Sequence, residues 1–537
     1  MRPMLCTHMG HPLVRGLRLL MVALLGLLLA LPARADGPAF LVKNINTTPD
    51  PSPSSDPQDL EAIGNTVYFS ALSKGYRGLW KSDGTAAGTV LVKEISPTEL
   101  TNVNGMLFFV ATGRELWKSD GTATGTAIVK DINGPINDGS LSWQKTNFKG
   151  QLFFVADDGI HGNELWKSDG TTAGTIPAST LLNVDAPGPI VGMNGSFFFG
   201  GSSGQTHGLW KSEGTPNSTV LLKEMNFIFD LASVNGTLFF VGPAATYGSE
   251  LWASDGTAAG TRLVKDIVPG GDHSDPNSLT NAHGRLFFTA NDRVHGRELW
   301  TSDGTAAGTT LVKNIRPDTR TPVDITPDPV ILGAVGRTLF FTISDGIHGD
   351  ELWKSDGTAA GTTLVQDIAP GRASSTPVGM AIAGSQLFFS ADDQSNGAEL
   401  WALRGDIDTF VQAPTLAGAP PNSPAAVPIQ YGNIGIASAS ALTLTATLDP
   451  ALTYVGDTSG ISPTISGQTL TWRISDASVV QGRGFTLSVR TPNAAYGTRY
   501  PVALTLAVAG QEAYPADNSA TVQVMIARQA YLPLTRR

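Results

Sequence analysis

Residues 281–315 read NAHGRLFFTANDRVHGRELWTSDGTAAGTTLVKNI, and variants of this stretch recur along the chain. The most constant part, close to Glu-Leu-Trp-Lys-Ser-Asp-Gly-Thr-Ala-Ala-Gly-Thr, surrounds eight tryptophans. The first and last of them lie 321 residues apart, so the mean period is about 46 residues. Strand-rich repeats of about 40 to 50 residues are typical of a propeller or a solenoid. The eight are Trp80, Trp117, Trp166, Trp210, Trp252, Trp300, Trp353 and Trp401.

Each repeat is expected to hold four short strands. In this copy the first strand covers residues 278–282 and leads into a tight turn, which is Asn104-Gly105 in an earlier copy. The Leu-Phe-Phe run of the second strand indicates burial on both faces. The third strand is Glu-Leu-Trp, and after the Asp-Gly-Thr turn the fourth is Leu-Val-Lys. No stretch after residue 36 has a helical period, so the predicted fold is all-β, with each repeat a four-stranded blade of a β-propeller.

The number of strand copies predicts how the propeller closes. Strands one to three occur eight times, whereas the fourth follows only seven of the tryptophan phrases. The missing copy stands at the other end of the chain, at residues 40–45. We therefore expect eight blades over residues 36–405, closed by this N-terminal strand beside the strand at 399–403, which removes two exposed sheet edges.

The first 35 residues are those of a secretory signal peptide. Arg2, Arg15 and Arg18 precede the apolar run 19–31, and Ala33-Arg34-Ala35 offers a cleavage site. A membrane anchor is the alternative, but the run is shorter than the ~20 residues that a spanning helix needs. The single cysteine, Cys6, lies in this segment, so we expect a secreted protein with neither disulfides nor thiolate metal sites.

The charge balance narrows the class of partner. Of the 36 basic residues four lie in residues 1–35, which leaves 32 against 46 acidic residues and a net charge of −14 after cleavage. Such a balance argues against nucleic acid as the main partner. We expect an extracellular protein or glycan as partner, no transmembrane segment after cleavage, and a monomer.

A second domain follows the repeats. Residues 406–430, rich in alanine and proline, are predicted to be a linker. Alternating segments such as 442–448 indicate an immunoglobulin-like β-sandwich over 431–527, and 528–537 form a C-terminal tail. The stretches 431–435, 448–455 and 517–522 resemble DUF11-like modules of bacterial surface proteins.

The tryptophan phrase resembles the repeat of the ELWxxDGT family of secreted bacterial proteins. The resemblance covers roughly residues 38–405, with a degraded fourth copy (Glu213 in place of the aspartate) and an eighth that ends after its tryptophan strand. It implies an extracellular, propeller-like domain and no established reaction.

Repeated polar residues are interpreted first as turn builders. The aspartate of each Asp-Gly-Thr turn, such as Asp169 or Asp356, can cap backbone amides. Alternatively, this aspartate could hold a Ca²⁺ ion in each turn, and a second acidic position in the loop before the tryptophan strand, which contributes Asp158 and Asp345, adds to the case for calcium. Histidines before several tryptophan strands, such as His161 and His348, are interpreted as polar loop caps. We expect no cofactor, with Ca²⁺ as the alternative.

Few features occur once, as a catalytic constellation would. Asp272, His273 and Asp275 form the only cluster that mixes acids with histidine, in a loop between blades, and a solvated loop is the alternative. Trp143 has no counterpart in other repeats and could stack on a sugar or fill the core. No catalytic residue is predicted.

The sequence therefore favours a secreted or cell-surface, non-enzymatic binding, adhesion or structural protein that presents a propeller face. The alternative is an extracellular hydrolase or lyase that acts on glycans at the propeller channel. Clustered carboxylates from different blades at the channel mouth would favour the enzyme.

Overall fold

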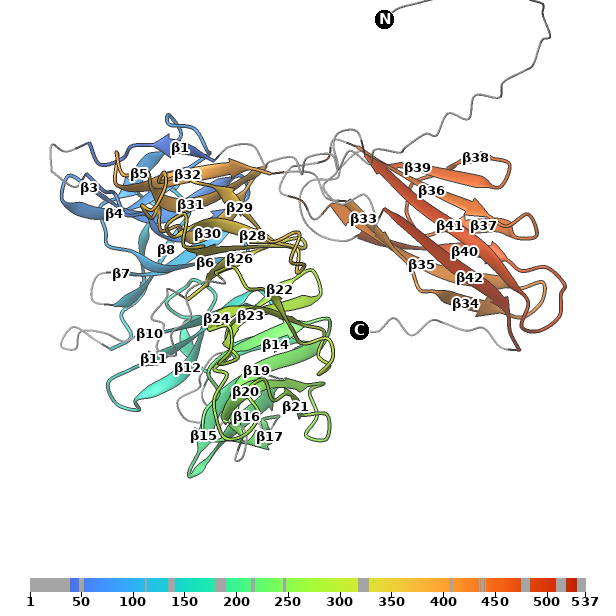
Figure 1. Ribbon diagram of the computed structural model, residues 1–537, viewed down its shortest axis with the longest axis horizontal. Helices are drawn as coiled ribbons and strands as arrows, with labels where there is room; N and C mark the ends of the chain where they lie inside the picture. Colours follow the sequence, from blue (N-terminus) through green and yellow to red (C-terminus); the bar gives the residue numbers. More distant parts are fainter. Residues whose placement is uncertain are drawn as a thin grey trace, which may run out of the picture. The chain divides into compact units, whose positions relative to one another are not determined.

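The computed structural model describes residues 39–47, 53–111, 114–133, 141–178, 190–213, 218–244, 248–316, 328–405, 409–433, 435, 439, 441–474, 483–508 and 518–528. Within these ranges every regular element is a β-strand (Figure 1). A search of the same residues finds no helix that is both long and apolar enough to span a membrane. The expected signal peptide and residues 529–537 of the expected tail lie outside the described residues.

Residues 40–404, which we call the repeat region, form eight four-stranded antiparallel sheets. We number the sheets in chain order. Sheet one consists of β2 (Gln58–Ile63), β3 (Thr66–Ser73), β4 (Tyr76–Ser82) and β5 (Val90–Lys93), and sheet two of β6 (Thr98–Val103), β7 (Met106–Ala111), β8 (Glu115–Ser119) and β9 (Ala127–Lys130). Sheet three consists of β10 (Leu141–Phe148), β11 (Gln151–Asp157), β12 (Asn163–Ser168) and β13 (Ile176–Pro177). Sheet four consists of β14 (Ile190–Met193), β15 (Ser196–Ser203), β16 (Thr206–Ser212) and β17 (Val220–Glu224).

The other four sheets repeat this order, except that the last takes its outer strand from the start of the chain. Sheet five consists of β18 (Leu231–Val234), β19 (Thr237–Ala244), β20 (Gly248–Ser254) and β21 (Arg262–Lys265), and sheet six of β22 (Asn277–Ala282), β23 (Arg285–Asn291), β24 (Arg297–Ser302) and β25 (Thr310–Lys313). Sheet seven consists of β26 (Val330–Val335), β27 (Thr338–Ile343), β28 (Glu351–Ser355) and β29 (Thr363–Gln366). Sheet eight consists of β30 (Val378–Ala383), β31 (Gln386–Asp392), β32 (Ala398–Arg404) and β1 (Phe40–Lys43).

The second strand of each sheet forms the core, as its Leu-Phe-Phe run predicts. Leu286, Phe287 and Phe288 of β23 are all fully buried. Three consecutive buried side chains require a partner on both faces of the sheet, because successive side chains point to opposite faces. Neighbouring sheets supply those partners: one core cluster joins Phe288 of sheet six to Phe239 of sheet five, and another joins Phe287 to Phe341 of sheet seven.

The first strands of the sheets lie beside one another. β2, β6, β10, β14, β18, β22, β26 and β30 are neighbours in that order, and β30 lies beside β2 again. The strand that carries the tryptophan is the third strand of its sheet, counted from the first strand. Its indole packs against the preceding sheet, and a lysine of that sheet bridges the two: Lys93 of β5 donates to the Thr126 carbonyl and lies 5.7 Å from the ring centroid of Trp117.

Strand β1 makes the same contacts from the start of the chain. It pairs antiparallel with β32, with Leu41 opposite Trp401. Lys43 donates to the carbonyl of Thr89 at 2.7 Å, as Lys93, Lys130, Lys265 and Lys313 do to the following sheet. Val42 and Ile45 are buried in a cluster with Phe69 of β3 and Phe388 of β31, so this segment packs against the first and the eighth sheets.

The C-terminal region is a sandwich of two sheets around its own core. One sheet has the order β33 (Thr409–Gln412), β35 (Pro424–Asn433), β40 (Arg483–Arg490), β37 (Thr453–Asp457); the other has β34 (Leu416–Ala419), β42 (Ser519–Ile526), β41 (Arg499–Val508), β36 (Leu442–Leu448), β39 (Thr469–Ile474), β38 (Thr464–Ser466). All pairs are antiparallel except β34 with β42, which is parallel. The core joins Val427 and Leu487 of one sheet to Leu444 and Val522 of the other.

The prediction of a linker over residues 406–430 is wrong where the structure describes them. Residues 409–412, 416–419 and 424–430 lie in sandwich strands. Composition was misleading here, because Ala425, Val427 and Ile429 alternate with exposed or half-buried residues and are themselves fully buried. That is the pattern of a strand with one buried face.

We predict that deletion of residues 39–46 lowers the free energy of unfolding by several kcal/mol, since ~25 cal/mol is lost per Å² of re-exposed apolar surface. It also frees the edge of β32, which favours aggregation. Urea unfolding and light scattering measure both effects. Truncation after residue 405 is the control, because the sandwich has a separate core. An unchanged unfolding midpoint after the N-terminal deletion would contradict the packing role of β1.

Candidate functional site

Antiparallel pairing gives each sheet of the repeat region two opposite ends, at which its strands begin or stop, and we call each of these ends an edge. The turn between strands two and three, the end of strand four and the start of the next sheet all lie at one edge, which we call the connection edge. The turns between strands one and two and between strands three and four lie at the opposite edge, the hairpin edge. A site built from several sheets must gather at one edge or the other.

The hairpin edge is made of nearly identical turns. Asp169 Oδ1 accepts hydrogen bonds from the amide and the hydroxyl of Thr171, each at 2.8 Å, and these bonds lower the pKa of the Asp169 carboxyl. Asp356 accepts the same two bonds from Thr358. A Cβ at Gly174 would overlap the Asp169 carboxylate, which explains the second glycine of the motif. These aspartates have the geometry of turn caps.

At the connection edge of sheets five, seven and eight a buried glutamate, the first residue of the Glu-Leu-Trp phrase, holds the sheet to the next one, whereas Gly78 and Gly208 take its place in sheets one and four. Glu351 accepts the amide of Ile368, which follows strand four, at 2.9 Å, and the hydroxyl of Ser375, which precedes the next sheet, at 2.6 Å. Glu250 has the same partners in Ile267 and Ser274. We call this arrangement the glutamate clamp.

Glu399 forms the clamp with the N-terminal segment. It accepts the amide of Ile45 at 2.9 Å and the hydroxyl of Ser55 at 2.6 Å, although these residues lie more than 340 positions earlier in the chain. Burial raises the pKa of Glu399 to about 6 and those of Glu250 and Glu298 to about 7. Because the same glutamates recur in successive sheets as packing groups, these pKa shifts do not indicate catalysis.

The predicted acidic loop before the tryptophan strand is a second repeated cap. Asp345 Oδ1 accepts the amides of Ile347 and His348, while Oδ2 lies 2.9 Å from His348 Nδ1. The Asp292–His295 and Asp158–His161 turns are the same. In sheet eight Asn396 donates to Asp393 in place of a histidine. The histidine is thus one of several residues that close this turn.

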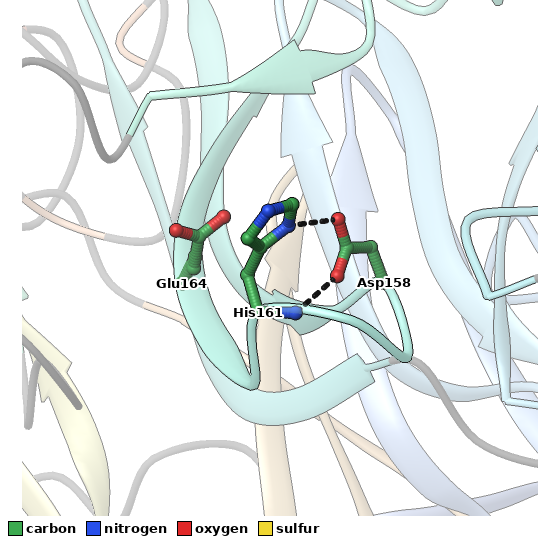
Figure 2. Close-up of side chains that lie close together, drawn as sticks. All are labelled: Asp158, His161 and Glu164. Atoms are coloured by element: carbon green, nitrogen blue, oxygen red, sulfur yellow. Dashed lines mark hydrogen bonds and ion pairs between the residues drawn. The ribbon is translucent and has the colours of Figure 1, made fainter.

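The turn in sheet three differs in one respect. Ligand atoms of Asp158, His161 and Glu164 lie within 4.8 Å of one another, and in the described part of the chain no other such group of three is found. Figure 2 shows the His161 imidazole between the two carboxylates. The hydrogen bond from His161 lowers the pKa of Asp158 to about 2, and Asp158 raises the pKa of His161.

The two groups of aspartates proposed as calcium ligands lie at opposite edges of their sheets. Asp158 lies at the connection edge and Asp169 at the hairpin edge of the same sheet, with the six residues of β12 between them. At ~3.3 Å per residue the two carboxylates are about 20 Å apart. Asp345 and Asp356 are separated by β28 in the same way. A calcium site would have to form at each turn alone.

The asymmetric loop of Asp272, His273 and Asp275 joins sheets five and six. His273 Nδ1 accepts the amide of Ser249 at 2.9 Å, so that nitrogen carries no proton for Asp275, 3.7 Å away. Between them Ser274 takes part in the glutamate clamp. All three of the predicted residues are exposed. Trp143 lies in β10, and its side chain is outside the described residues.

Sequence reasoning missed a group of charged residues on the first strands. Lys145 of β10 forms an ion pair with Glu99 of β6 at 2.5 Å, with side chains 4% and 15% exposed. Burial lowers the pKa of Lys145. The charge and the hydrogen bond of Glu99 oppose this decrease, as does the charge of Asp59 on β2. Burial raises the pKa of Glu61, also on β2, while its bond from the Asn102 amide opposes that rise. We call these four residues the inner charge group.

The connection edge also exposes large apolar side chains. Tyr76 begins β4, the others lie in loops between strands two and three or between two sheets, and each is 57–81% exposed. Phe227 and Phe229 stack with ring centroids 6.0 Å apart. The full set is Tyr76, Ile160, Phe227, Phe229, Val294 and Ile347.

No family model and no curated protein matches the sequence. Among solved structures, the chain is similar to one of two prolyl endopeptidases studied for inter-domain dynamics (9% identity, 71% of this chain and 55% of that chain, TM-score 0.37). It is also similar to the β-propeller domain of the Trilobed protease from Pyrococcus furiosus (12% identity, 58% and 98%, TM-score 0.37). A cohesin from Acetivibrio cellulolyticus matches 22% of this chain (12% identity, 99% of that chain, TM-score 0.17).

This chain thus spans just over half of the prolyl endopeptidase that it matches. All three TM-scores are low, and the likenesses carry no argument about what this chain does.

The raised pKa of Glu298 predicts a pH dependence of stability. Its Oε2 is buried without a hydrogen-bond partner among the described residues. The folded state therefore favours the protonated carboxyl, whose contribution to stability is present below about pH 4.5 and is lost as the pH rises through about 7. We expect the melting temperature of the wild type to fall more between pH 4.5 and 7.5 than that of Glu298→Gln. Equal slopes for the two proteins would contradict the assignment.

Proposed function

We propose that this chain is a secreted or cell-surface binding protein of the ELWxxDGT type. The repeat region is an eight-bladed β-propeller closed by β1, and the sandwich is a DUF11-like spacer or attachment module. The proposal is supported by the neighbouring first strands, by the pairing of β1 with β32, and by the tryptophan phrase itself. The partner is an extracellular protein or glycan.

The difference between the two edges carries the proposal. The hairpin edge repeats one turn from sheet to sheet, with the same aspartate and threonine contacts. The connection edge varies: it exposes one aromatic pair, isolated aliphatic residues in other places, and hydrogen-bonded His–Asp turns. Exposed apolar side chains collected on one face are characteristic of a surface that binds a partner. The connection edge is the recognition face.

A second candidate function is a glycan-active hydrolase or lyase. The inner charge group favours it, because Asp59, Glu61, Glu99 and Lys145 come from three neighbouring sheets and Glu61 and Lys145 have shifted pKa values. Against it stands the ion pair, which already engages Lys145 and Glu99. We therefore rank binding above catalysis.

The binding proposal is tested on an array of extracellular glycans and matrix proteins with the double variant Phe227→Ser, Phe229→Ser. We expect the variant to lose at least ~10-fold in affinity for any partner of the wild type, because exposed aromatic side chains dominate such interfaces. The matched control is Val90→Ser, Leu91→Ser. These residues are about 40% exposed at the start of β5, at the hairpin edge, and should not affect binding.

The same samples decide between the two functions. Bound glycans are recovered and their chain length is measured, with Glu61→Gln as the comparison. Unchanged glycans after binding support recognition alone. Shortened glycans with the wild type and intact ones with Glu61→Gln would overturn the ranking in favour of the enzyme.

A further inference from the structure

In the Asp158 turn one ring nitrogen of His161 is hydrogen-bonded to Asp158, and the other nitrogen faces the carboxylate of Glu164. Asp158 Oδ2 lies 2.8 Å from His161 Nδ1, and Asp158 Oδ1 accepts the amides of Ile160 and His161. No hydrogen bond to Nε2 is found among the described residues. Figure 2 places Glu164 on the side of the ring away from Asp158. The imidazole is therefore held in a fixed orientation with Nε2 toward a second acid.

This is the arrangement that metal-binding histidines use. A histidine ligand usually donates its other N–H to a carboxylate, which fixes the tautomer and strengthens the ligand. Asp158 supplies that carboxylate. Imidazole nitrogen together with a carboxylate oxygen suits Zn²⁺ and similar first-row divalent ions rather than Ca²⁺, which prefers oxygen ligands only.

Sheets six and seven contain the same residue types at the same spacing but use them differently. Glu298 and Glu351 are buried at 3% and 0% exposure, and their carboxylates accept the amides of Ile315 and Ile368. In these two sheets the ligand atoms of the aspartate, the histidine and the glutamate do not form a group in which all three lie within 4.8 Å of one another. Glu164 is half-buried and lies beside His161 instead. In sheets six and seven the Asp-x-x-His-x-x-Glu sequence therefore builds only a turn. In sheet three it builds the same turn and also leaves the histidine and the glutamate side by side as possible ligands.

We propose that sheet three binds one first-row divalent metal ion through His161 Nε2 and the Glu164 carboxylate, with Asp158 as the positioning residue. The histidine side chain is 61% exposed, so the ion exchanges freely with solvent. Two protein ligands leave coordination positions for water or for an oxygen atom of a bound partner. The site lies at the connection edge beside the exposed Ile160, so it would add a polar anchor to the recognition face. The proposal itself does not depend on that function.

The test is calorimetric titration of the untagged, chelator-treated full chain with Zn²⁺. We expect one site per chain. His161→Ala and Glu164→Gln should each reduce the affinity at least ~10-fold, and Asp158→Asn by ~10–100-fold. Titration with Co²⁺ gives a second readout: the wild type should show a visible absorption band that both ligand variants lose and Asp158→Asn shifts, which a purely structural role of Asp158 would not produce.

His348→Ala, Asp345→Asn and Glu351→Gln are the matched controls from sheet seven. They remove the same residue types from the same turn, so they should lower the melting temperature of the metal-free protein without changing Zn²⁺ binding or the Co²⁺ spectrum. Absence of binding by the wild type overturns the proposal. So does equal binding by the wild type and His161→Ala, which would mean adventitious sites at other surface histidines.

Discussion

A buried carboxylate at the start of the third strand ties sheets five, seven and eight of the repeat region to the sheets that follow them. In the glutamate clamp Glu351 accepts the Ile368 amide and the Ser375 hydroxyl, and thereby ties strand three to the end of strand four and to the start of the following sheet. Hydrogen bonds to a charged acceptor contribute ~1.5–3 kcal/mol each. The tryptophan and lysine contacts also join neighbouring sheets, including sheets one and two, where Gly78 stands in place of the glutamate.

The clamp also explains why the N-terminal strand belongs with the last repeat. Glu399 has no fourth strand after it, and its acceptor atoms are used by Ile45 and Ser55. Lys43 then repeats, toward Thr89 of the first sheet, the contact that Lys313 makes toward Thr362. Two independent interactions of the repeat are thus completed by a segment from the other end of the chain, which is the physical basis for the closed propeller that we propose.

The sequence predicted most of the scaffold and little of the candidate sites. Four-stranded units follow from the Leu-Phe-Phe and Glu-Leu-Trp runs, because burial on both faces and tight Gly turns leave few alternatives. The inner charge group was missed because the first strands vary most: Glu99 and Lys145 lie in different sequence contexts and meet only when β6 lies beside β10. The strands within 409–430 were missed because small and proline residues hid the alternation at Ala425, Val427 and Ile429. Nothing in the sequence distinguishes Glu164 from Glu351, since the difference lies in where each carboxylate points.

The central claim is that the glutamate clamp holds the N-terminal segment in place as it holds the fourth strands of sheets five and seven. Hydrogen exchange of peptides covering 40–46 and 363–369, read by mass spectrometry, tests it most directly. In the wild type both peptides should be protected to a similar degree, because Ile45 and Ile368 donate to equivalent glutamates at 2.9 Å. Glu399→Ala should release protection in 40–46 and leave 363–369 unchanged. Exchange of residues 40–46 at the rate of an unprotected peptide in the wild type would contradict the account.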